Sequence, residues 1–475
     1  MILEPISQSD WHARCEAVLA DGGRFAGLYA VNRDPGDGTG PGAGPGVRAL
    51  FVDADGHRLL ASEAPDSVVA SIVDLAPAAG WDEREAHDLY GLHFPGHDPL
   101  RPLIAHPAEL ADWVLPTSGH DVHQVAVGPI HAGIIESGHF RFHVIGEKVL
   151  HLDLRLFYKH RGLERAAEGR TLEEGLAYAQ RACAACAVSN SVAYVHATEL
   201  LLGLWPEPGL ARARTVLLEL ERLYNHLNDI GAVCAGVGFA AGAMAFAALK
   251  ERAQRLNRAL TGHRFLFDTV ALGGSTWRVA PGAAAEARRE LRELADDAEK
   301  AWHEVFFNAL VQDRLVGVGV LAPETVRRMG VVGPAARAAG CSVDARTDSP
   351  RLTYPGFTPA VPHSAAGDVA DRVNVRALEM EASLRILDEL LDGGVEPART
   401  ASGAAETVGV ASVESPRGET ICVVEAEAGR VARLHLRTGS FANWPAVATA
   451  TAGAILADFP VINKSFELCY SCCDR

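Results

Sequence analysis

The clearest regular pattern of apolar residues lies between Ala370 and Leu391. Apolar side chains recur there at alternating steps of four and three, which puts them on one face of a helix: Val373, Ala377, Met380, Leu384, Leu387 and Leu391. We therefore predict a helix over Ala370–Leu391 that packs on the core. The chain also predicts helices over Ala211–Asn228 and Ala284–Leu310.

A further helix is predicted to begin at Thr171. Thr171 and Glu174 fit a capping box, in which each side chain accepts a hydrogen bond from the backbone amide of the other residue. We expect this helix to continue past Cys183 and Cys186. A separation of three residues would then put both thiols on the same helical face.

Short runs of β-prone residues flank the helical region. Near the start they fall at Leu28–Val31, Arg48–Val52 and Ser67–Leu75, and a loop rich in Gly and Pro is expected at Asp34–Gly46. In the rest of the chain, β-prone runs predict strands within His139–Val144, Lys148–Leu154, Thr407–Val424 and Arg430–Leu436.

A second break that contains Pro and Gly, at Ala105–His120, predicts a domain boundary. A chain of 475 residues is also too long for one compact core. We expect a small α/β domain over residues 1–110 and a mainly helical domain over residues 121–475, with short β-sheets near its ends. The predicted fold class is α+β.

The stretch Ile230–Leu249 carries no charged residue and has the length of a membrane span. Gly and Ala dominate it, so its hydrophobicity is low for a span. We predict a buried helix inside a bundle instead, because small residues let helices approach closely.

Charge and composition exclude some classes of function. The net charge is −16, and an acidic chain is a poor nucleic-acid binder because phosphate contacts need clustered Lys and Arg. Met1–Asp10 does not have the pattern of a signal peptide. Nine cysteines in a long chain of this kind indicate metal or redox chemistry rather than a disulfide scaffold.

Four of the cysteines form two CxxC pairs, Cys183/Cys186 and Cys469/Cys472. Four thiolates select zinc, iron–sulfur clusters or another thiophilic metal. A structural zinc site is one reading of these pairs. Zinc ribbons, however, bring their pairs within about 15–20 residues of each other, whereas most of this chain separates the two pairs.

The two pairs resemble the N-terminal and C-terminal metal motifs of nickel–iron hydrogenase large subunits. The resemblance extends to other segments of the energy-converting, formate hydrogenlyase-like branch of that family: Val127–Arg141, Glu221–His226, Arg314–Gly319 and Glu414–Glu419. Before them, Trp81–Gly91 and Phe94–Arg101 resemble the thirty-kilodalton subunit of NADH:quinone oxidoreductase, respiratory complex I. The resemblance thus covers nearly the whole chain.

The resemblance implies a nickel–iron centre with CO and cyanide ligands. In the family's pattern, Cys183 and Cys469 would be terminal ligands of nickel, and Cys186 and Cys472 would bridge nickel and iron. The thiolate of Cys469 would accept a proton from H2, and Glu136 would relay it outward. Arg417, which reads as part of a tight turn, matches the arginine that overhangs the metals.

The resemblance also implies partners. The remaining cysteines make no second cluster, so electrons would leave through an iron–sulfur small hydrogenase subunit. Membrane-arm subunits related to complex I would couple the reaction to ion pumping. The expected place is cytoplasmic and peripheral, on the inner face of the cell membrane. The end of the chain at Arg475 resembles the form of the family that has been processed after nickel insertion, and an unprocessed gene end gives the same sequence.

Departures from the family's motifs keep two other hypotheses open. Ala184 and Ala185 stand within the first CxxC pair, Asn190 stands where the family has His, and Glu467–Leu468 replaces Asp-Pro. One alternative is a complex I-like quinone-linked connecting subunit with an altered or absent metal site, in which His131 or His139 binds quinone. The other is a scaffold subunit that zinc stabilises.

Overall fold

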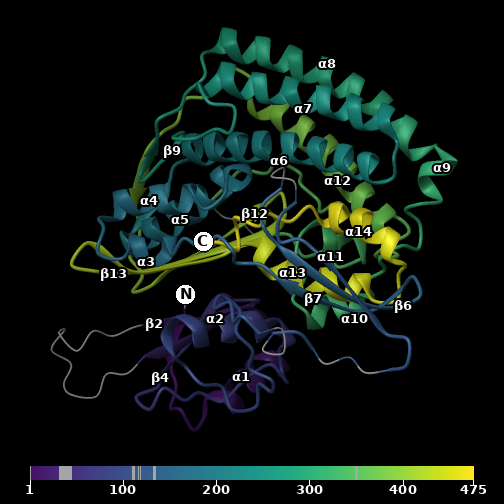
Figure 1. Cartoon of the computed structure of the whole chain (residues 1–475). Helices are drawn as coiled ribbons and strands as arrows, with labels where there is room; N and C mark the ends of the chain where they lie inside the picture. Colours follow the sequence, from purple (N-terminus) through teal and green to yellow (C-terminus); the bar gives the residue numbers. More distant parts are fainter. Residues whose placement is uncertain are drawn as a thin grey trace.

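The computed structural model describes residues 2–31, 45–109, 113–115, 117, 119–131, 135–347 and 351–475. A small N-terminal unit lies against a larger body that carries the long helices (Figure 1). Helices and small sheets occur in both parts, which confirms the α+β class. Apart from Pro45 and Gly46, the predicted loop Asp34–Gly46 lies outside the described residues.

The N-terminal unit is a four-stranded sheet covered by two helices. The strands lie in the order β1–β4–β3–β2, and only β1 and β4 are parallel: β1 (Ile2–Pro5), β2 (Arg24–Val31), β3 (Gly46–Asp53) and β4 (Gly56–Glu63). The helices are α1 (Trp11–Ala20) and α2 (Gly80–Tyr90), the latter directly after the short 3-10 helix η1 (Pro77–Ala79). The prediction of a strand at Ser67–Leu75 is wrong, because this segment forms a single bridge, from Val68 to His93.

Both faces of this sheet are buried, because successive strand residues point to opposite sides. On one face, Phe25 and Phe51 belong to the unit's own core with Trp11. On the other, residues such as Tyr29 join a small apolar cluster with residues of the larger body, among them Val410. The unit therefore has a core of its own and is also packed against the body. The boundary between residues 110 and 121 stays a prediction.

The long helices of the body pack side by side (Figure 1). They are α6 (Pro208–Gly236), α7 (Ala240–Thr261), α8 (Pro281–Phe306) and α12 (Val369–Leu390). Helix α6 lies between α7 and α12. The predicted helices over Ala211–Asn228 and Ala370–Leu391 are confirmed. The one over Ala284–Leu310 is confirmed only as far as Phe306, because the separate short helix α9 (Ala309–Gln312) follows α8.

The prediction of one buried helix over Ile230–Leu249 is wrong. The chain turns between α6 and α7, where Gly238 adopts a φ of 76° that favours glycine. Small residues still serve close packing, since Gly231 of α6 lies against Phe246 of α7. In the part of the chain that the structure describes, no helix has the length and apolarity needed to cross a membrane.

The remaining elements surround this bundle. Two antiparallel three-stranded sheets are β5 (His123–Val127), β6 (His139–Ile145), β7 (Lys148–Arg155), and β12 (Gly409–Ser415), β13 (Gly418–Glu427), β14 (Arg430–Arg437). Two-stranded pairs join β8 (Leu204–Pro206) to β11 (Thr400–Ser402) and β9 (Val270–Ala271) to β10 (Gly274–Ser275). The shorter helices are α3 (Leu163–Ala167), α4 (Leu172–Gln180), η3 (Ala184–Cys186), α5 (Ala187–Leu201), α10 (Pro323–Arg328), α11 (Pro334–Ala338), α13 (Gly439–Thr451), η4 (Leu456–Asp458) and α14 (Phe459–Phe466).

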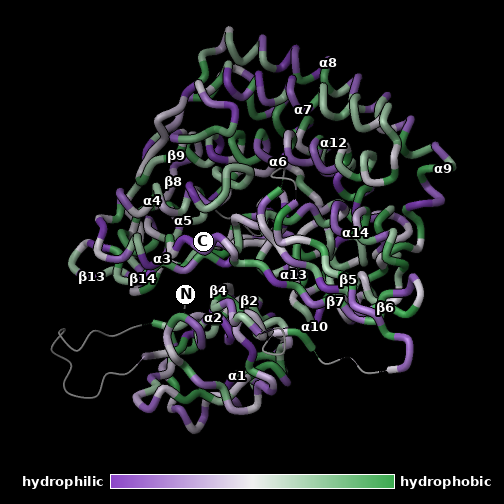
Figure 2. Tube along the Cα trace, in the orientation of Figure 1, coloured by the Kyte–Doolittle hydropathy of each residue, from purple (hydrophilic) through white to green (hydrophobic). Residues whose placement is uncertain are grey.

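Hydropathy along the chain follows this arrangement (Figure 2). The outer helix α8 alternates between hydrophilic and hydrophobic residues, as expected of a helix with one face toward solvent. Helix α5, by contrast, is buried around its whole circumference from Ala187 to Glu199. The segment that leads into α5 carries the first cysteine pair, so that pair adjoins a fully buried helix.

Candidate metal centre

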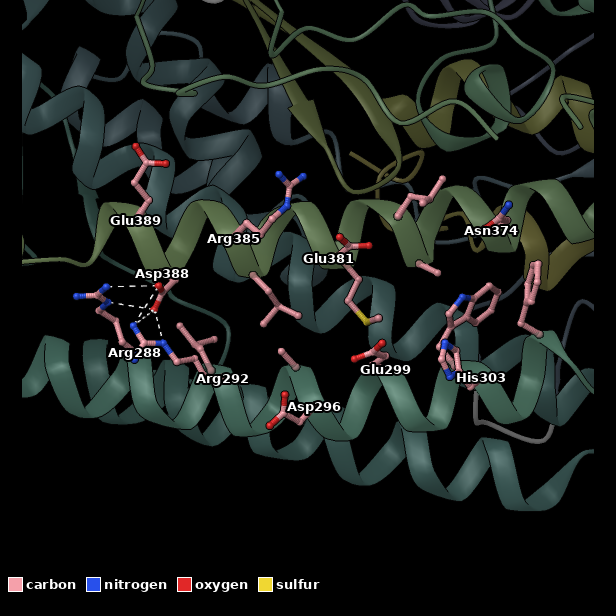
Figure 3. A pocket seen from close by; sticks show the side chains of 18 of the residues that line it. Arg288, Arg292, Asp296, Glu299, His303, Asn374, Glu381, Arg385, Asp388 and Glu389 are labelled. Atoms are coloured by element: carbon pink, nitrogen blue, oxygen red, sulfur yellow. Dashed lines mark hydrogen bonds and ion pairs between the residues drawn. The ribbon is translucent and has the colours of Figure 1, made fainter. Parts of the chain in front are cut away.

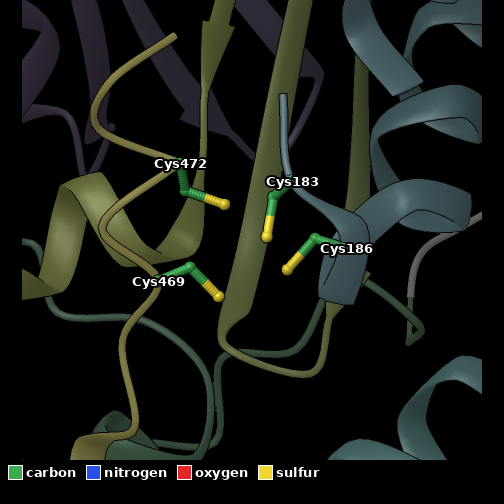
Figure 4. Close-up of side chains that lie close together, drawn as sticks. All are labelled: Cys183, Cys186, Cys469 and Cys472. Carbon is green, nitrogen blue, oxygen red and sulfur yellow. The ribbon is translucent and has the colours of Figure 1, made fainter. Parts of the chain in front are cut away.

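The fold brings the two CxxC pairs together. The sulfur atoms of Cys183, Cys186, Cys469 and Cys472 all lie within 4.8 Å of one another. Figure 4 shows the four side chains pointing toward a common centre from two separate segments. Cys469 is half-buried and the other three are buried. Four convergent soft donors of this kind fit a thiophilic metal centre.

The thiols of this cluster form hydrogen bonds with one another. Hydrogen bonds from Cys186, and then from Cys469 and Cys472, hold the pKa of Cys183 well below that of an ordinary thiol. The same sharing of protons raises the pKa of Cys186 well above its usual range. The cluster therefore favours at least one thiolate, which is the form that binds metal.

The first cysteine pair does not lie on a helix, so the prediction of a continuous helix through it is wrong. The capping box at Thr171 is confirmed, but α4 ends at Gln180. Cys183 is extended, with φ −155° and ψ 132°, and Cys186 ends the short 3-10 helix η3 just before α5. This bend lets both thiols face the second pair instead of lying along one helical face.

Three residues of α6 explain the bend. The carboxylate of Glu221 accepts hydrogen bonds from the amides of Val188 and Ser189, at 2.6 and 3.0 Å, at the start of α5. These are orphan donors that a continuous helix would have used internally. One turn further along α6, the side chains of Tyr224 and Asn225 donate hydrogen bonds to the carbonyl of Ala185, at 3.2 and 2.8 Å.

The second cysteine pair follows α14. Glu467 ends this helix with a positive φ of 47°. The amide of Cys469 then donates a hydrogen bond to Ser440 at the start of α13, at 3.0 Å. Thr438 donates to the carbonyl of Cys472, at 3.4 Å. The N-terminal end of α13 thus positions the second pair.

Arg161, between β7 and α3, bridges the two pairs. Its guanidinium donates to the carbonyls of Arg181 and Ala182, just before Cys183, at 3.0 and 2.7 Å. It also donates to the carbonyls of Ser471 and Asp474, at 2.7 and 3.0 Å. One side chain therefore holds both segments that carry the thiols. Sequence reasoning missed it because its partners are backbone atoms.

Arg417 occupies the predicted tight turn, between the paired residues Ser415 and Gly418 of the β12–β13 hairpin. Its guanidinium is buried and forms an ion pair with Asp229 of α6 and a hydrogen bond of 3.1 Å with Asn225. Burial opposes this charge, but Asp229, Cys469 and Cys186 raise the pKa of Arg417 well above its ordinary value. The guanidinium of Arg417 therefore lies near enough to Cys469 and Cys186 to interact with them electrostatically.

Asp229 is a functional candidate that the sequence did not indicate. It also pairs with Arg376 of α12, at 3.1 Å. Although burial alone would raise its pKa, Arg417 and the neighbouring cations lower the pKa of Asp229 to about 2. This ion pair continues into a set of buried charged side chains that includes Arg222, His226, Arg337, Glu379 and Glu414.

The signal for this buried set was present in the sequence. Beside the apolar stripe of α12 runs a second stripe, Arg372, Arg376, Glu379 and Ser383, at the same alternating spacing of four and three. All four side chains are buried. Charged residues at helical spacing next to an apolar stripe usually indicate the solvent-exposed edge of a helix. In this structure they face the interior of the bundle instead.

Glu136 is half-buried and lies against the second pair. Its carboxylate accepts a hydrogen bond of 2.7 Å from the amide of Ser471, between Cys469 and Cys472. The two histidines of the quinone hypothesis lie near the same hairpin. His131 bonds to the carbonyl of Gly138 at 2.7 Å, and burial lowers the pKa of His139.

Not every departure from the family's motifs is compensated. Asn190, one turn after Cys186, is fully buried, and neither polar atom of its side chain has a hydrogen-bond partner among the described residues. Glu467 lies next to the Asp229–Arg417 pair, and burial together with Asp229 raises its pKa to about 7.

Comparison with known proteins shows the family to which the chain belongs. The family model of the 49 Kd subunit of respiratory-chain NADH dehydrogenase matches residues 236–402 and 397–475, and that of the 30 Kd subunit matches residues 47–117. Formate hydrogenlyase subunit 5 of Escherichia coli is 31% identical over 436 residues, covering 85% of this chain and 76% of the relative. Hydrogenase-4 component G of the same organism is 30% identical, covering 90% and 78%.

A solved structure supports the same assignment. A chain of the membrane-bound sulfane sulfur reductase, an archaeal respiratory membrane complex, superposes with a TM-score of 0.68 at 26% identity. The superposition covers 75% of this chain and 99% of that one. The chain therefore belongs to the complex I-related family of nickel–iron hydrogenase large subunits and NADH dehydrogenase 49 Kd subunits, and it carries a fused 30 Kd-like unit.

Proposed function

We propose that this chain is the catalytic subunit of a membrane-associated nickel–iron hydrogenase complex, which interconverts H2 with protons and electrons. The observation that carries the proposal is the convergence of four thiols within 4.8 Å, in a chain whose relatives include several hydrogenase subunits. A quinone-binding cavity has no need of four soft donors.

The donor set suits a nickel–iron centre. Cys183, Cys186, Cys469 and Cys472 would together hold the nickel–iron centre through their four thiolates. A bound nickel–iron centre with CO and cyanide ligands supplies the Lewis acidity and redox capacity for heterolytic cleavage of H2. All other steps of this proposal are proton transfers and positioning by side chains of this chain.

Proton transfer is assigned to Cys469 and Glu136. Cys469 is more exposed than the other three cysteines of the cluster, so its thiol is the best placed to pass a proton outward. Glu136 is fixed by the amide of Ser471, two residues beyond Cys469, so its carboxylate can receive that proton and relay it. Arg417 provides a permanent positive charge beside the thiols and, through Asp229 and Asn225, a fixed orientation.

The partners follow from the same proposal. Relatives of this chain are components of membrane-bound complexes. We assign electron exit to an iron–sulfur small subunit, and anchoring to membrane-arm subunits related to complex I. The chain would then lie on the inner face of the cell membrane as a peripheral protein. We also propose the domain limits 1–110 and 121–475, which the separate core of the N-terminal unit supports.

The test is metal analysis combined with activity on the purified complex. The proposal expects one nickel and one iron per chain in this subunit and hydrogen-dependent reduction of an artificial electron acceptor, both lost in Cys469→Ser. Zinc alone, or no metal, together with quinone-dependent activity that survives Cys469→Ser would overturn it. That outcome would favour the connecting-subunit hypothesis, to which NADH-quinone oxidoreductase relatives at 29–30% identity also point.

A further inference from the structure

A long groove runs between α8 and α12, two antiparallel helices (Figure 3). At one end Arg288 of α8 pairs with Asp388 of α12, and at the other His303 lies opposite Asn374. The groove encloses about 980 Å³. At 1.5 Å per residue, the stretch from Arg288 to Phe306 extends about 27 Å, the length of a helix of about 18 residues.

The floor of the groove is apolar and one end is open. Leu291, Met380 and Leu384 line the floor. At the open end, Phe306 and Phe307 are 42% and 74% exposed. Aromatic side chains left in water at the end of an apolar groove indicate an interaction site rather than an ordinary surface.

The groove is negatively charged on balance, because six carboxylates line it against three arginines: Asp296, Glu299, Glu381, Asp388, Glu389 and Asp392 against Arg288, Arg292 and Arg385. At its closed end, Arg288 and Arg292 are neutralised by Asp388. Further along, Asp296, Glu299 and Glu381 line the groove, and within the described residues none of these three forms an ion pair. A ligand that fills the groove must therefore combine an apolar side with positive charge along its edges.

We propose that the groove holds an amphipathic helix of a partner subunit, with its apolar stripe on the floor and Lys or Arg side chains against the three carboxylates. A third helix can pack in the groove between two antiparallel helices at the normal distance between helix axes. The partner helix would contact the floor through apolar residues at its positions i, i+3, i+4 and i+7. The inference rests on the proposed function, because it assumes the assembled complex.

Photo-crosslinking identifies the occupant. A benzophenone amino acid is placed at Phe307 in the assembled complex, and the crosslinked peptides are sequenced by mass spectrometry. The proposal expects a peptide from another subunit with apolar residues at helical spacing and flanking Lys or Arg. Crosslinks confined to this chain, to a second copy of it or to a subunit segment without that pattern would overturn it, as would no crosslink.

A matched pair of charge variants tests the electrostatic part. Asp296→Lys with Glu299→Lys is compared with Glu293→Lys and Glu304→Lys, which make the same charge change on α8 outside the groove. After a salt wash, the groove variant should retain at least tenfold less of the crosslinked subunit than the control. Equal retention contradicts the proposal. Nickel and iron are measured on the same samples, so failure of the hydrogenase assignment is distinguished from failure of the groove.

Discussion

At the scale of single residues, Glu136 and Arg417 differ in what remains available for chemistry. Both terminal nitrogens of Arg417 are engaged by Asp229 and Asn225, so it acts as a fixed charge. Glu136 has one oxygen held by Ser471, and within the described residues its other oxygen makes no hydrogen bond. An anchored carboxylate with a free oxygen suits proton relay.

We predict that Glu136→Gln lowers hydrogen turnover by about 10²-fold. The amide oxygen still accepts the hydrogen bond from Ser471, so the loop should keep its position, but the side chain no longer carries a proton. Turnover is measured with nickel and iron content on the same sample. The control is Glu147→Gln, at the exposed turn of the neighbouring hairpin. Turnover above half that of the unmodified chain would exclude Glu136 as the relay.

Glu221 makes the stability of the folded chain depend on pH. Burial raises its pKa to about 7 from an ordinary value of 4.5, despite the hydrogen bonds from Ser189 and Val188. Between pH 4.5 and about 7, the folded chain therefore still holds a proton on Glu221 that the unfolded chain has already lost. The stability that this group contributes is full below about pH 4.5 and is lost as the pH rises toward 7.

In Glu221→Gln this loss should disappear, since the side chain is neutral at every pH. Its one oxygen can accept from only one of the two backbone amides of Val188 and Ser189, so the variant should be less stable at every pH but with a flatter pH profile. The midpoint of urea unfolding, followed from pH 4.5 to 8, should vary less with pH in the variant than in the unmodified chain. For a single group the difference amounts to about 1.4 kcal/mol per pH unit in this window. Parallel pH profiles of the two proteins would show that Glu221 does not titrate there.

Residues of the site were predictable to different degrees. The four cysteines stand out because CxxC spacing is a property of the sequence itself, and Pro416–Arg417–Gly418 signals a turn wherever the chain places it. Asp229 and Arg161 act through partners that are distant in sequence or are backbone carbonyls. No local pattern reports such contacts.

At the scale of elements, the spacing of apolar residues predicted helices reliably where one face of the helix packs on the core. Helix α12 matches its predicted range to within one residue at either end. The helix predicted through the cysteines failed because Glu221 takes the amides at the start of α5. The strand predicted at Ser67–Leu75 does not form. The apolar residues of this segment, Val69 and Ile72, are buried while its backbone stays irregular, so the apolar run reported burial and not a strand.

Arg161 tests how the elements are joined at the site. We predict that Arg161→Gln lowers nickel content at least fivefold, because it removes hydrogen bonds that hold both cysteine segments, each worth roughly 1.5–3 kcal/mol to a charged donor. Arg165→Gln, on α3, is the control, because within the described residues the exposed Arg165 side chain pairs with Glu168 alone. Metal content is measured in both, with the melting temperature as a check on folding. Full nickel loading in Arg161→Gln would show that the two segments find each other without the bridge.

At the scale of the whole molecule, the N-terminal unit is joined to the body by more than the apolar cluster. Asp82 of α2 forms a buried ion pair with Arg437 of β14, at 3.0 Å. Arg475, three residues past Cys472, pairs with Glu85 of α2 at 3.1 Å and with Glu164 of α3 at 2.7 Å. The segment with the second cysteine pair therefore contacts both parts of the chain.

Because the charged groups of Asp82 and Arg437 are buried, removing one of them leaves the other charge unpaired. A single substitution should therefore lower the free energy of unfolding more than the double substitution does. We predict that Asp82→Ala and Arg437→Met each destabilise the chain by about 3–5 kcal/mol, and that the double variant loses less than the sum. Chemical denaturation of the four proteins gives the coupling. Strict additivity would mean that the pair does not stabilise the contact between the N-terminal unit and the body.

The four thiols are proposed to hold a nickel–iron centre, and infrared spectroscopy of the purified complex tests this assignment. Sharp bands in the CO and cyanide stretching region, on a sample that contains nickel and iron, are the predicted result. The substitutions at Ala184, Ala185 and Asn190 would then tune a working centre. A spectrum without these bands, on a sample that contains only zinc or no metal, would show that the four thiols do not hold a nickel–iron centre.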